Sequence, residues 1–197
     1  MIRLKHLPLD SISVSSPYGK RSITVNNRYY WWHNGTDFKA PLNSPVYAVA
    51  DGRVAAARYD DSYGYYAALD HGKFGTLYAH LSRLNVAEND YIRAGQIIAY
   101  TGSTGDSTGP HLHFEIRLSP YENFWDRVHC DSSVFMNTVD PMIFIEDFLD
   151  RESDLSLGEA IAIVQSEAGL EDKTMEYMAR HYRYGEDLVK KLAKAIK

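Results

Sequence analysis

The sequence predicts a mainly β protein, a small antiparallel β-sheet or sandwich domain followed by a C-terminal α-helical appendage. Up to about Ile145, short apolar runs alternate with turn residues, which is typical of an antiparallel all-β core. After Asp140-Pro141 the composition shifts, and apolar residues recur at helical spacing. The length of 197 residues suits one domain of ordinary size with an appendage, or two small domains. We therefore expect a domain over residues 1–148 and a helical segment over residues 149–197.

The expected strands are short and are separated by residues that favour turns. Their apolar runs are Val46–Ala50, Arg53–Ala57, Tyr65–Leu69, Gly75–His80, Gln96–Tyr100 and His111–Arg117. Asp51-Gly52 between the first two runs is a strong hairpin signal, so we expect these two strands to pair. A loop rich in Gly, Ser and Thr, from Thr101 to Gly109, joins the last two.

The C-terminal segment carries three helical stripes of apolar residues. Ser156 and Glu159 have the spacing of a capping box at the start of the first helix. The stripes are Leu157, Ile161, Val164 and Ala168, then Met175, Met178 and Tyr182, then Leu188, Leu192 and Ile196. Such helices pack against themselves or the β-domain, or they form a targeting module that binds a protein partner.

Composition and net charge favour some functional classes over others. Hydrophobic residues make up 45% and charged residues 24% of the chain, so we expect a packed core. The net charge of −5 argues against nucleic acid as the main partner. No apolar run is long enough to span a membrane, and the N-terminus has no apolar core of signal-peptide length. The single cysteine, Cys130, cannot form an intrachain disulfide.

Histidines and one aspartate in Gly-rich contexts are the candidate functional residues. His111 and His113 are two apart on an expected strand, so both imidazoles project from the same face, while Leu112 and Phe114 point into the core. Both can ligate one metal, or one ligates while the other acts on a bound water. An exposed pair of strand histidines without a metal would show the same pattern.

A second pair, His33 and Asp37, surrounds the turn residues Asn34-Gly35. A compact turn would deliver both side chains to one point, although a local hydrogen bond would also explain the pair. Two histidines and an aspartate together would give Zn²⁺ three protein ligands and leave a fourth position open for water. The other histidines would then serve proton transfer or stabilisation of an oxyanion.

Several separate motifs, in order, extend this pattern along the chain. They are Ser16–Gly19, His33–Phe38, Pro45–Gly52, Leu69–Gly72, Tyr78–Ser82, Ala94–Gln96, Gly102–Gly105 and Ser107–Glu115. With them, the stretch from about Ser15 to Pro141 resembles the lysostaphin-type (LytM-like) zinc metalloendopeptidases, which cleave peptidoglycan and have a small antiparallel β-fold. The resemblance covers roughly two thirds of the chain.

The resemblance implies a role for each of five residues. It makes His33, Asp37 and His113 the zinc ligands, and it makes His80 and His111 the catalytic pair beside the metal. The implied reaction is hydrolysis of a peptide bond in peptidoglycan stem peptides or cross-bridges. The alternative is a catalytically silent relative that binds peptidoglycan or activates other hydrolases, but the presence of all five residues favours an enzyme.

The implied substrate places the activity in the cell wall or periplasm. Since the chain shows no signal peptide, we expect a phage or mobile-element lysin, or a domain trimmed from a longer chain.

Other features of the chain suggest accessory roles. Glu115 lies on the strand face of His113, where it could orient a ligand. The loop Thr101–Gly109 lacks the lysine of a phosphate-binding loop, so we interpret it as lining a substrate groove. The aromatic segment Asn26–Trp32 either contacts the substrate or serves packing. The segment Leu118–Val139 is long for such a domain and could shape specificity or occlude the site. His71 is interpreted as a structural turn residue.

Overall fold

A computed structural model describes residues 2–118, 138–153 and 165 of the chain. The chain divides into two compact units, Met1–Phe148 and Leu149–Lys197. The helical stripes expected between Leu157 and Ile196, and most of the segment Leu118–Val139, lie outside the described residues. Among the residues described, no helix is long and apolar enough to cross a membrane.

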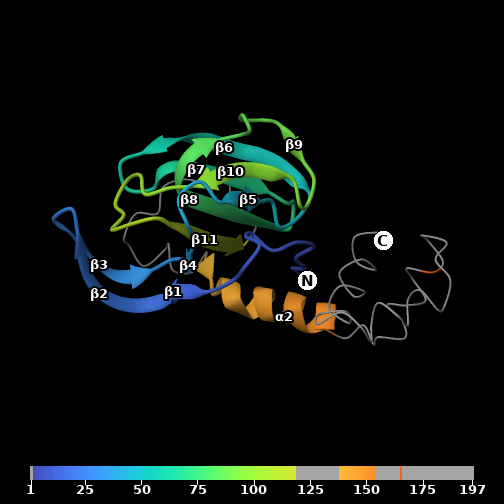
Figure 1. Ribbon diagram of the computed structural model, residues 1–197, viewed down its shortest axis with the longest axis horizontal. Coiled ribbons are helices and arrows are strands. Elements are labelled where there is room, and N and C mark those ends of the chain that lie inside the picture. Colours follow the sequence, from blue (N-terminus) through green and yellow to red (C-terminus); the bar gives the residue numbers. More distant parts are fainter. Residues whose placement is uncertain (1, 119–137, 154–164, 166–197) are drawn as a thin grey trace, which may run out of the picture. The chain divides into compact units, whose positions relative to one another are not determined.

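The first unit is built mainly from antiparallel strands (Figure 1), which confirms the predicted fold class. The strands are β1 (Val14–Ser16), β2 (Gly19–Val25), β3 (Arg28–His33), β4 (Thr36–Lys39), β5 (Pro45–Tyr47), β6 (Gly52–Asp60), β7 (Gly64–Asp70), β8 (Phe74–Leu84), β9 (Tyr91–Ile92), β10 (Ile97–Thr101), β11 (His111–Leu118) and β12 (Thr138–Val139). The main sheet has the order β1-β4-β11-β8-β7-β6-β9. Strand β10 pairs with β5 and β8, β12 pairs with β11, and β2 and β3 form a separate two-stranded sheet.

Strand β11 lies in the middle of this arrangement, between β4 and β8. Leu112, Phe114 and Ile116 on one face are fully buried in the core. The ring of Phe114 packs against Phe38 and Tyr78, with ring centroids 6.4 and 5.1 Å apart. Each such apolar side chain contributes about 1.5–3 kcal/mol by leaving water. This packing fixes the register of β11. The opposite face of the strand, which carries His111 and His113, therefore points away from the core, as predicted.

The prediction that the strands on either side of Asp51-Gly52 pair as a hairpin is wrong. Strand β5 pairs with β10, whereas β6 pairs with β7 and β9. Asp51 instead accepts a hydrogen bond from the backbone amide of Ala94, at 2.9 Å. A Cβ on Gly52 would lie 2.4 Å from the carbonyl oxygen of Asp70, so the glycine permits a close approach between strands. The turn signal reflects only the local sequence, whereas contacts between strands that are distant in sequence determine which strands pair.

Several observed elements were absent from the predicted set, among them the hairpin β2–β3 and helix α2 (Pro141–Ser153). Strands β2 and β3 form a hairpin whose turn residues, Asn26 and Asn27, have φ of 49° and 63°. Two adjacent asparagines with positive φ suit the tight turns that join paired strands. Helix α2 begins at Pro141, whereas the β region was expected to extend to about Ile145. Asp140 caps it by accepting a hydrogen bond from the amide of Met142, and Pro141 occupies the first helical position.

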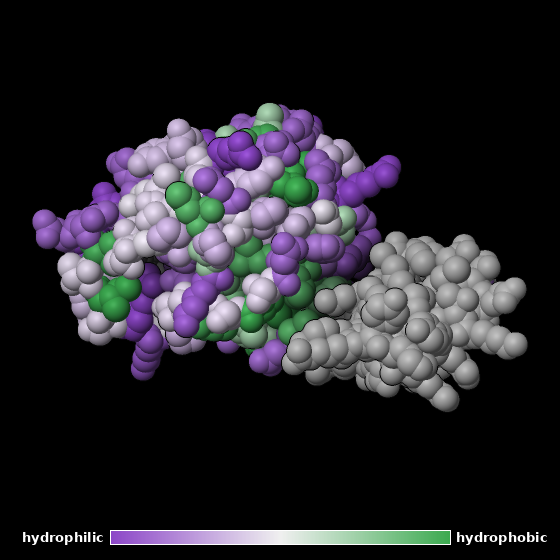
Figure 2. All heavy atoms as spheres, viewed as in Figure 1, coloured by the Kyte–Doolittle hydropathy of each residue, from purple (hydrophilic) through white to green (hydrophobic). Residues whose placement is uncertain are grey.

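Polar residues cover most of the visible face of the described part, and apolar residues reach it in separate patches (Figure 2). The exposed large apolar side chains include Tyr29 and Trp31, which lie on β3 in the predicted aromatic segment.

Candidate metal centre

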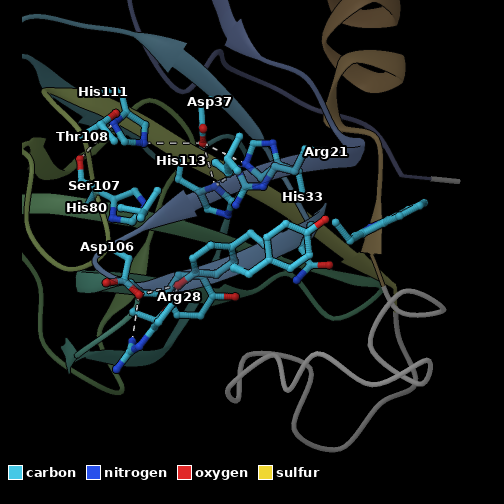
Figure 3. Close-up of a pocket in the computed structure, with 18 of the residues that line it drawn as sticks. Arg21, Arg28, His33, Asp37, His80, Asp106, Ser107, Thr108, His111 and His113 are labelled. Atoms are coloured by element: carbon cyan, nitrogen blue, oxygen red, sulfur yellow. Dashed lines mark hydrogen bonds and ion pairs between the residues drawn. The ribbon is translucent and has the colours of Figure 1, made fainter.

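Three of the predicted residues converge on one point of the structure (Figure 3). His113 on β11 pairs directly with Asp37 on β4, and its Nδ1 lies 2.8 Å from Asp37 Oδ1. The bend at Asn34-Gly35 between β3 and β4 brings His33 close to Asp37. Nε2 of His33 lies 3.1 Å from Asp37 Oδ1 and 3.0 Å from His113 Nδ1. Sheet register and one tight bend thus bring the side chains together.

Gly35 is required by the close approach of this bend to β11. A Cβ at this position would lie 2.4 Å from the carbonyl oxygen of Phe114 and 3.0 Å from Cε1 of His113. Any side chain would therefore push the bend away from the strand that carries His113.

The outer nitrogens of both histidines are occupied elsewhere. Nδ1 of His33 lies 2.8 Å from the carbonyl oxygen of Pro17, and Nε2 of His113 lies 2.9 Å from Oε1 of Glu115. Since a carbonyl or carboxylate oxygen only accepts, each neutral ring donates outward and presents a bare nitrogen inward. Two bare nitrogens and a carboxylate oxygen then face one another and repel unless a cation lies among them.

The donor set fits Zn²⁺. Imidazole nitrogen and carboxylate oxygen are ordinary zinc ligands, and tetrahedral bonds of about 2.0–2.2 Å place ligand atoms about 3.3 Å apart. The observed separations of 2.8–3.1 Å are within a few tenths of an ångström of that value.

In the metal-free protein a proton takes the place of the cation. Burial lowers the pKa of His113, but hydrogen bonds to Asp37 and Glu115 outweigh it and raise that pKa to about 9. Burial would raise the pKa of Asp37, yet its hydrogen bonds with His113 and His33 hold it well below its usual value. Burial lowers the pKa of His33. The centre therefore attracts positive charge.

His80 reaches the pocket because of a β-bulge. The pairs Tyr65–Leu81 and Ala67–Tyr78 show one extra residue in β8 at this place. His80 itself has φ of 59°, in the left-handed region, and its amide donates to the carbonyl of Tyr63 at 2.8 Å. With strict alternation, His80 would share the core-facing side of Tyr78. The bulge redirects it toward the histidines of β11.

His80 and His111 lie side by side, with ring centroids 4.7 Å apart (Figure 3). Nδ1 of His80 donates to the carbonyl of Thr104 at 2.9 Å, and Nδ1 of His111 donates to that of Gly109 at 2.8 Å. Each neutral ring is thus left with an unprotonated Nε2. Nε2 of His111 lies 3.7 Å from Asp37 Oδ1. Burial lowers the pKa of His80 to about 3, so this ring is neutral at pH 7.

The pocket around these residues has a volume of about 450 Å³. Asp106, Ser107 and Thr108 line it, so the loop Thr101–Gly109 has the predicted position. The hairpin β2–β3, which includes the predicted aromatic segment, also lines the pocket, and the rings of Trp31 and Trp32 pack against each other as well. The lining residues of this hairpin are Arg21, Ile23, Val25, Arg28, Tyr29, Tyr30, Trp31 and Trp32.

Asp106 joins this loop to the hairpin and was missed in the sequence. Its carboxylate accepts hydrogen bonds from Asn26 at 3.1 Å and Arg28 at 2.9 Å, and it also accepts one from the hydroxyl of Tyr30. Asp106 lies in a polar loop, and nothing in the local pattern marks it. Only the folded hairpin β2–β3 brings its partners near.

Glu115 contacts His113, as its strand face suggested, but its own partners were missed. Arg117, two residues further along β11, donates from Nε to Oε2 of Glu115 at 2.6 Å. This interaction outweighs burial and lowers the pKa of Glu115 to about 2. The period of two along the strand could have identified Arg117.

His71 lies outside the centre, in agreement with its structural interpretation. Its Nδ1 lies 2.8 Å from the carbonyl oxygen of Asp51, and its Nε2 lies 2.8 Å from Oγ1 of Thr76.

Comparisons with known proteins place the fold and the motifs in one family. A model described as peptidase family M23 matches residues 32–124. The peptidoglycan DD-endopeptidase ShyB of Vibrio cholerae is 44% identical over 85 residues, which cover 43% of this chain and 20% of that protein. The chain thus spans only a small part of this relative.

Two solved structures extend the likeness to the whole domain. The catalytic domain of lysostaphin from Staphylococcus simulans matches with a TM-score of 0.59 and 31% identity, over 72% of this chain and 99% of that one. A zinc-containing peptidase from Vibrio cholerae matches with a TM-score of 0.57 and 32% identity, over 72% of this chain and 40% of that one. Because the likeness spans nearly all of a solved catalytic domain, and the residues matched by the family model include His33 and His113, this chain belongs to peptidase family M23.

Proposed function

We propose that the chain is a zinc-dependent endopeptidase that hydrolyses peptide bonds in peptidoglycan stem peptides or cross-bridges. The observation that supports this most strongly is the convergence of three inward-facing acceptor atoms beside two further imidazoles in one pocket. The printed names of the relatives, a peptidoglycan DD-endopeptidase and a zinc-containing peptidase, agree with it.

In this proposal, His33, Asp37 and His113 are the metal ligands. Three protein ligands leave a position open, as in catalytic zinc sites. Zinc bound there supplies a Lewis acid that polarises the scissile carbonyl and lowers the pKa of water to about 7.

His80 and His111 are the proton-transfer residues of the proposal. Their Nδ1 atoms are held by backbone carbonyls, so each ring has a fixed orientation and an unprotonated Nε2. One Nε2 accepts the proton of the attacking water and then donates it to the leaving amine nitrogen. As an imidazolium, the ring also stabilises negative charge on the former carbonyl oxygen.

The substrate peptide would lie between the hairpin β2–β3 and the loop Thr101–Gly109. The flat faces of Trp31 and Tyr29 offer contact area along this path, and both are exposed. Because peptidoglycan lies outside the cytosol, we propose that the protein acts in the cell wall or periplasm. We also propose a domain boundary near residue 148. We propose that residues 149–197 bind a protein partner.

Digestion of purified sacculi tests the function directly. Mass spectrometry would identify the fragments released by the native chain, by the chain with a zinc chelator, and by the His111→Ala variant. We expect fragments with new peptide termini from the native chain only, and their return when zinc is restored to the chelated sample. No release from several wall types by zinc-loaded protein would contradict an endopeptidase and favour a binding role.

A further inference from the structure

One face of β11 carries a continuous series of polar residues. His111, His113, Glu115 and Arg117 follow one another at intervals of two, so they share the face opposite the core. Among the described histidines of the pocket, His113 differs from the others in the partner of its outer ring nitrogen. The outer nitrogen contacts a backbone carbonyl in His33, His80 and His111. The outer nitrogen of His113 instead contacts the carboxylate of Glu115, at 2.9 Å.

Glu115 is itself held from both sides. Oε1 accepts a hydrogen bond from the hydroxyl of Tyr63 at 2.9 Å, and Oε2 accepts one from Nε of Arg117 at 2.6 Å. Nη2 of Arg117 also donates to the Tyr63 hydroxyl oxygen at 3.1 Å, so hydrogen bonds connect each of these three side chains to the other two. The side chains of Glu115 and Arg117 are 0% and 2% exposed. Desolvation of an ion pair buried this deeply is costly, and the hydrogen bonds at both oxygens oppose rotation of the carboxylate.

We propose that Glu115, fixed by Arg117 and Tyr63, is a positioning residue that prepares His113 to bind the metal. A neutral imidazole carries one N–H, and an acceptor at Nε2 selects the form in which Nδ1 is bare. Nδ1 is the atom that lies 2.8 Å from Asp37 and 3.0 Å from Nε2 of His33. Glu115 therefore sets both the tautomer and the ring orientation. This inference rests on the proposed function of His113 as a ligand.

The competing interpretation is a buried ion pair that only stabilises the fold. The two interpretations differ in one measurable quantity, the zinc affinity of folded protein. A purely structural pair would change the free energy of unfolding and leave the zinc dissociation constant of the folded protein unchanged.

The test is the Zn²⁺ dissociation constant of the full chain, measured by competition with a chromophoric chelator at constant pH. We expect Glu115→Leu, which removes the acceptor, to weaken zinc binding about 10–100-fold, the range for lost partners of metal-ligating histidines. Tyr63→Phe should weaken it by less. Tyr78→Phe is the matched control, because its buried hydroxyl contacts Thr76 and the amide of Val49 and not the site. Its zinc affinity should equal that of the native chain.

Glu115→Leu removes the carboxylate partner of a buried arginine, so a second variant guards against unfolding. The double variant Glu115→Leu/Arg117→Met removes both charges, and it should show the same loss of affinity. Native-like zinc affinity in a folded Glu115→Leu or double variant would overturn the inference alone. Failure of the native chain to bind zinc would overturn the proposed metal centre together with it.

Discussion

At the scale of single residues, the pocket histidines differ in what their inner nitrogens face. Those of His33 and His113 lie within 3.1 Å of the Asp37 carboxylate, whereas Nε2 of His111 lies 3.7 Å from it. His80 contacts the rings of His111 and His113. This geometry is the basis on which we propose His33, Asp37 and His113 as metal ligands and His80 and His111 as proton-transfer residues.

We therefore expect two classes of alanine variant. His113→Ala and Asp37→Ala should lose zinc and activity together, because each removes a ligand. His80→Ala and His111→Ala should keep zinc and lose activity by about 10²–10⁴-fold, the usual contribution of a proton-transfer residue. Zinc content after dialysis, measured beside peptide release, distinguishes the classes. A His111→Ala protein without zinc would contradict these roles.

If His113 binds zinc as proposed, its protonation makes zinc binding depend on pH. In the metal-free protein the pKa of His113 is raised to about 9, so below pH 9 zinc must displace a proton. We expect the apparent affinity to rise about tenfold per pH unit from pH 7 to 9 and then to level off. Calorimetry in buffers of different ionisation enthalpy would measure the proton released. An affinity that does not change between pH 7 and 9 would contradict the raised pKa.

At the scale of elements, the hairpin β2–β3 and the loop Thr101–Gly109 are joined through Asp106. Asp106→Ala removes its hydrogen bonds with Asn26, Arg28 and Tyr30, so the aromatic wall of the pocket loses its support. We expect KM to rise roughly tenfold, equivalent to about 1.4 kcal/mol of binding, while zinc content stays unchanged.

The control for this variant is Asp61→Ala. Asp61 is an exposed aspartate in the turn between β6 and β7. Its KM should match that of the native chain. Equal KM values for Asp106→Ala and the native chain would show that the hairpin does not depend on this contact.

The bend between β3 and β4 provides a test of local packing. Gly35→Ala places a Cβ 2.4 Å from the Phe114 carbonyl oxygen, so we expect a loss of about 1–3 kcal/mol in the free energy of unfolding. Gly109→Ala is the matched control, because a Cβ there meets nothing within 4 Å. Denaturant titration of both variants would measure the difference. A Gly35→Ala protein as stable as Gly109→Ala would refute the crowding.

Sequence reasoning succeeded where the determining interactions were local. The alternation along His111–Arg117 predicted which face meets the core, and the turn signal at Asn34-Gly35 predicted that His33 and Asp37 return to one place. It failed at Asp51-Gly52, where pairing with distant strands overrode a strong turn signal. The turn at Asn26-Asn27 and the cap at Asp140 had recognisable signals that were overlooked.

At the scale of the whole molecule, the site depends on contacts between segments far apart in sequence. Tyr63 comes from the turn after β6, and it meets Glu115 of β11 only because β7 and β8 bring them together. No local pattern could give that contact, nor the one between Asp106 and Tyr30. The ordered motifs predicted five site residues, and these residues come from four different strands that the fold brings to one pocket.

The central claim is that His33, Asp37 and His113 hold zinc. The most direct measurement is anomalous diffraction at the zinc edge from crystals of zinc-loaded protein. We expect one strong peak about 2.0–2.2 Å from Nε2 of His33, an oxygen of Asp37 and Nδ1 of His113. No peak there, or a peak bound by His80 and His111 in their place, would contradict the claim.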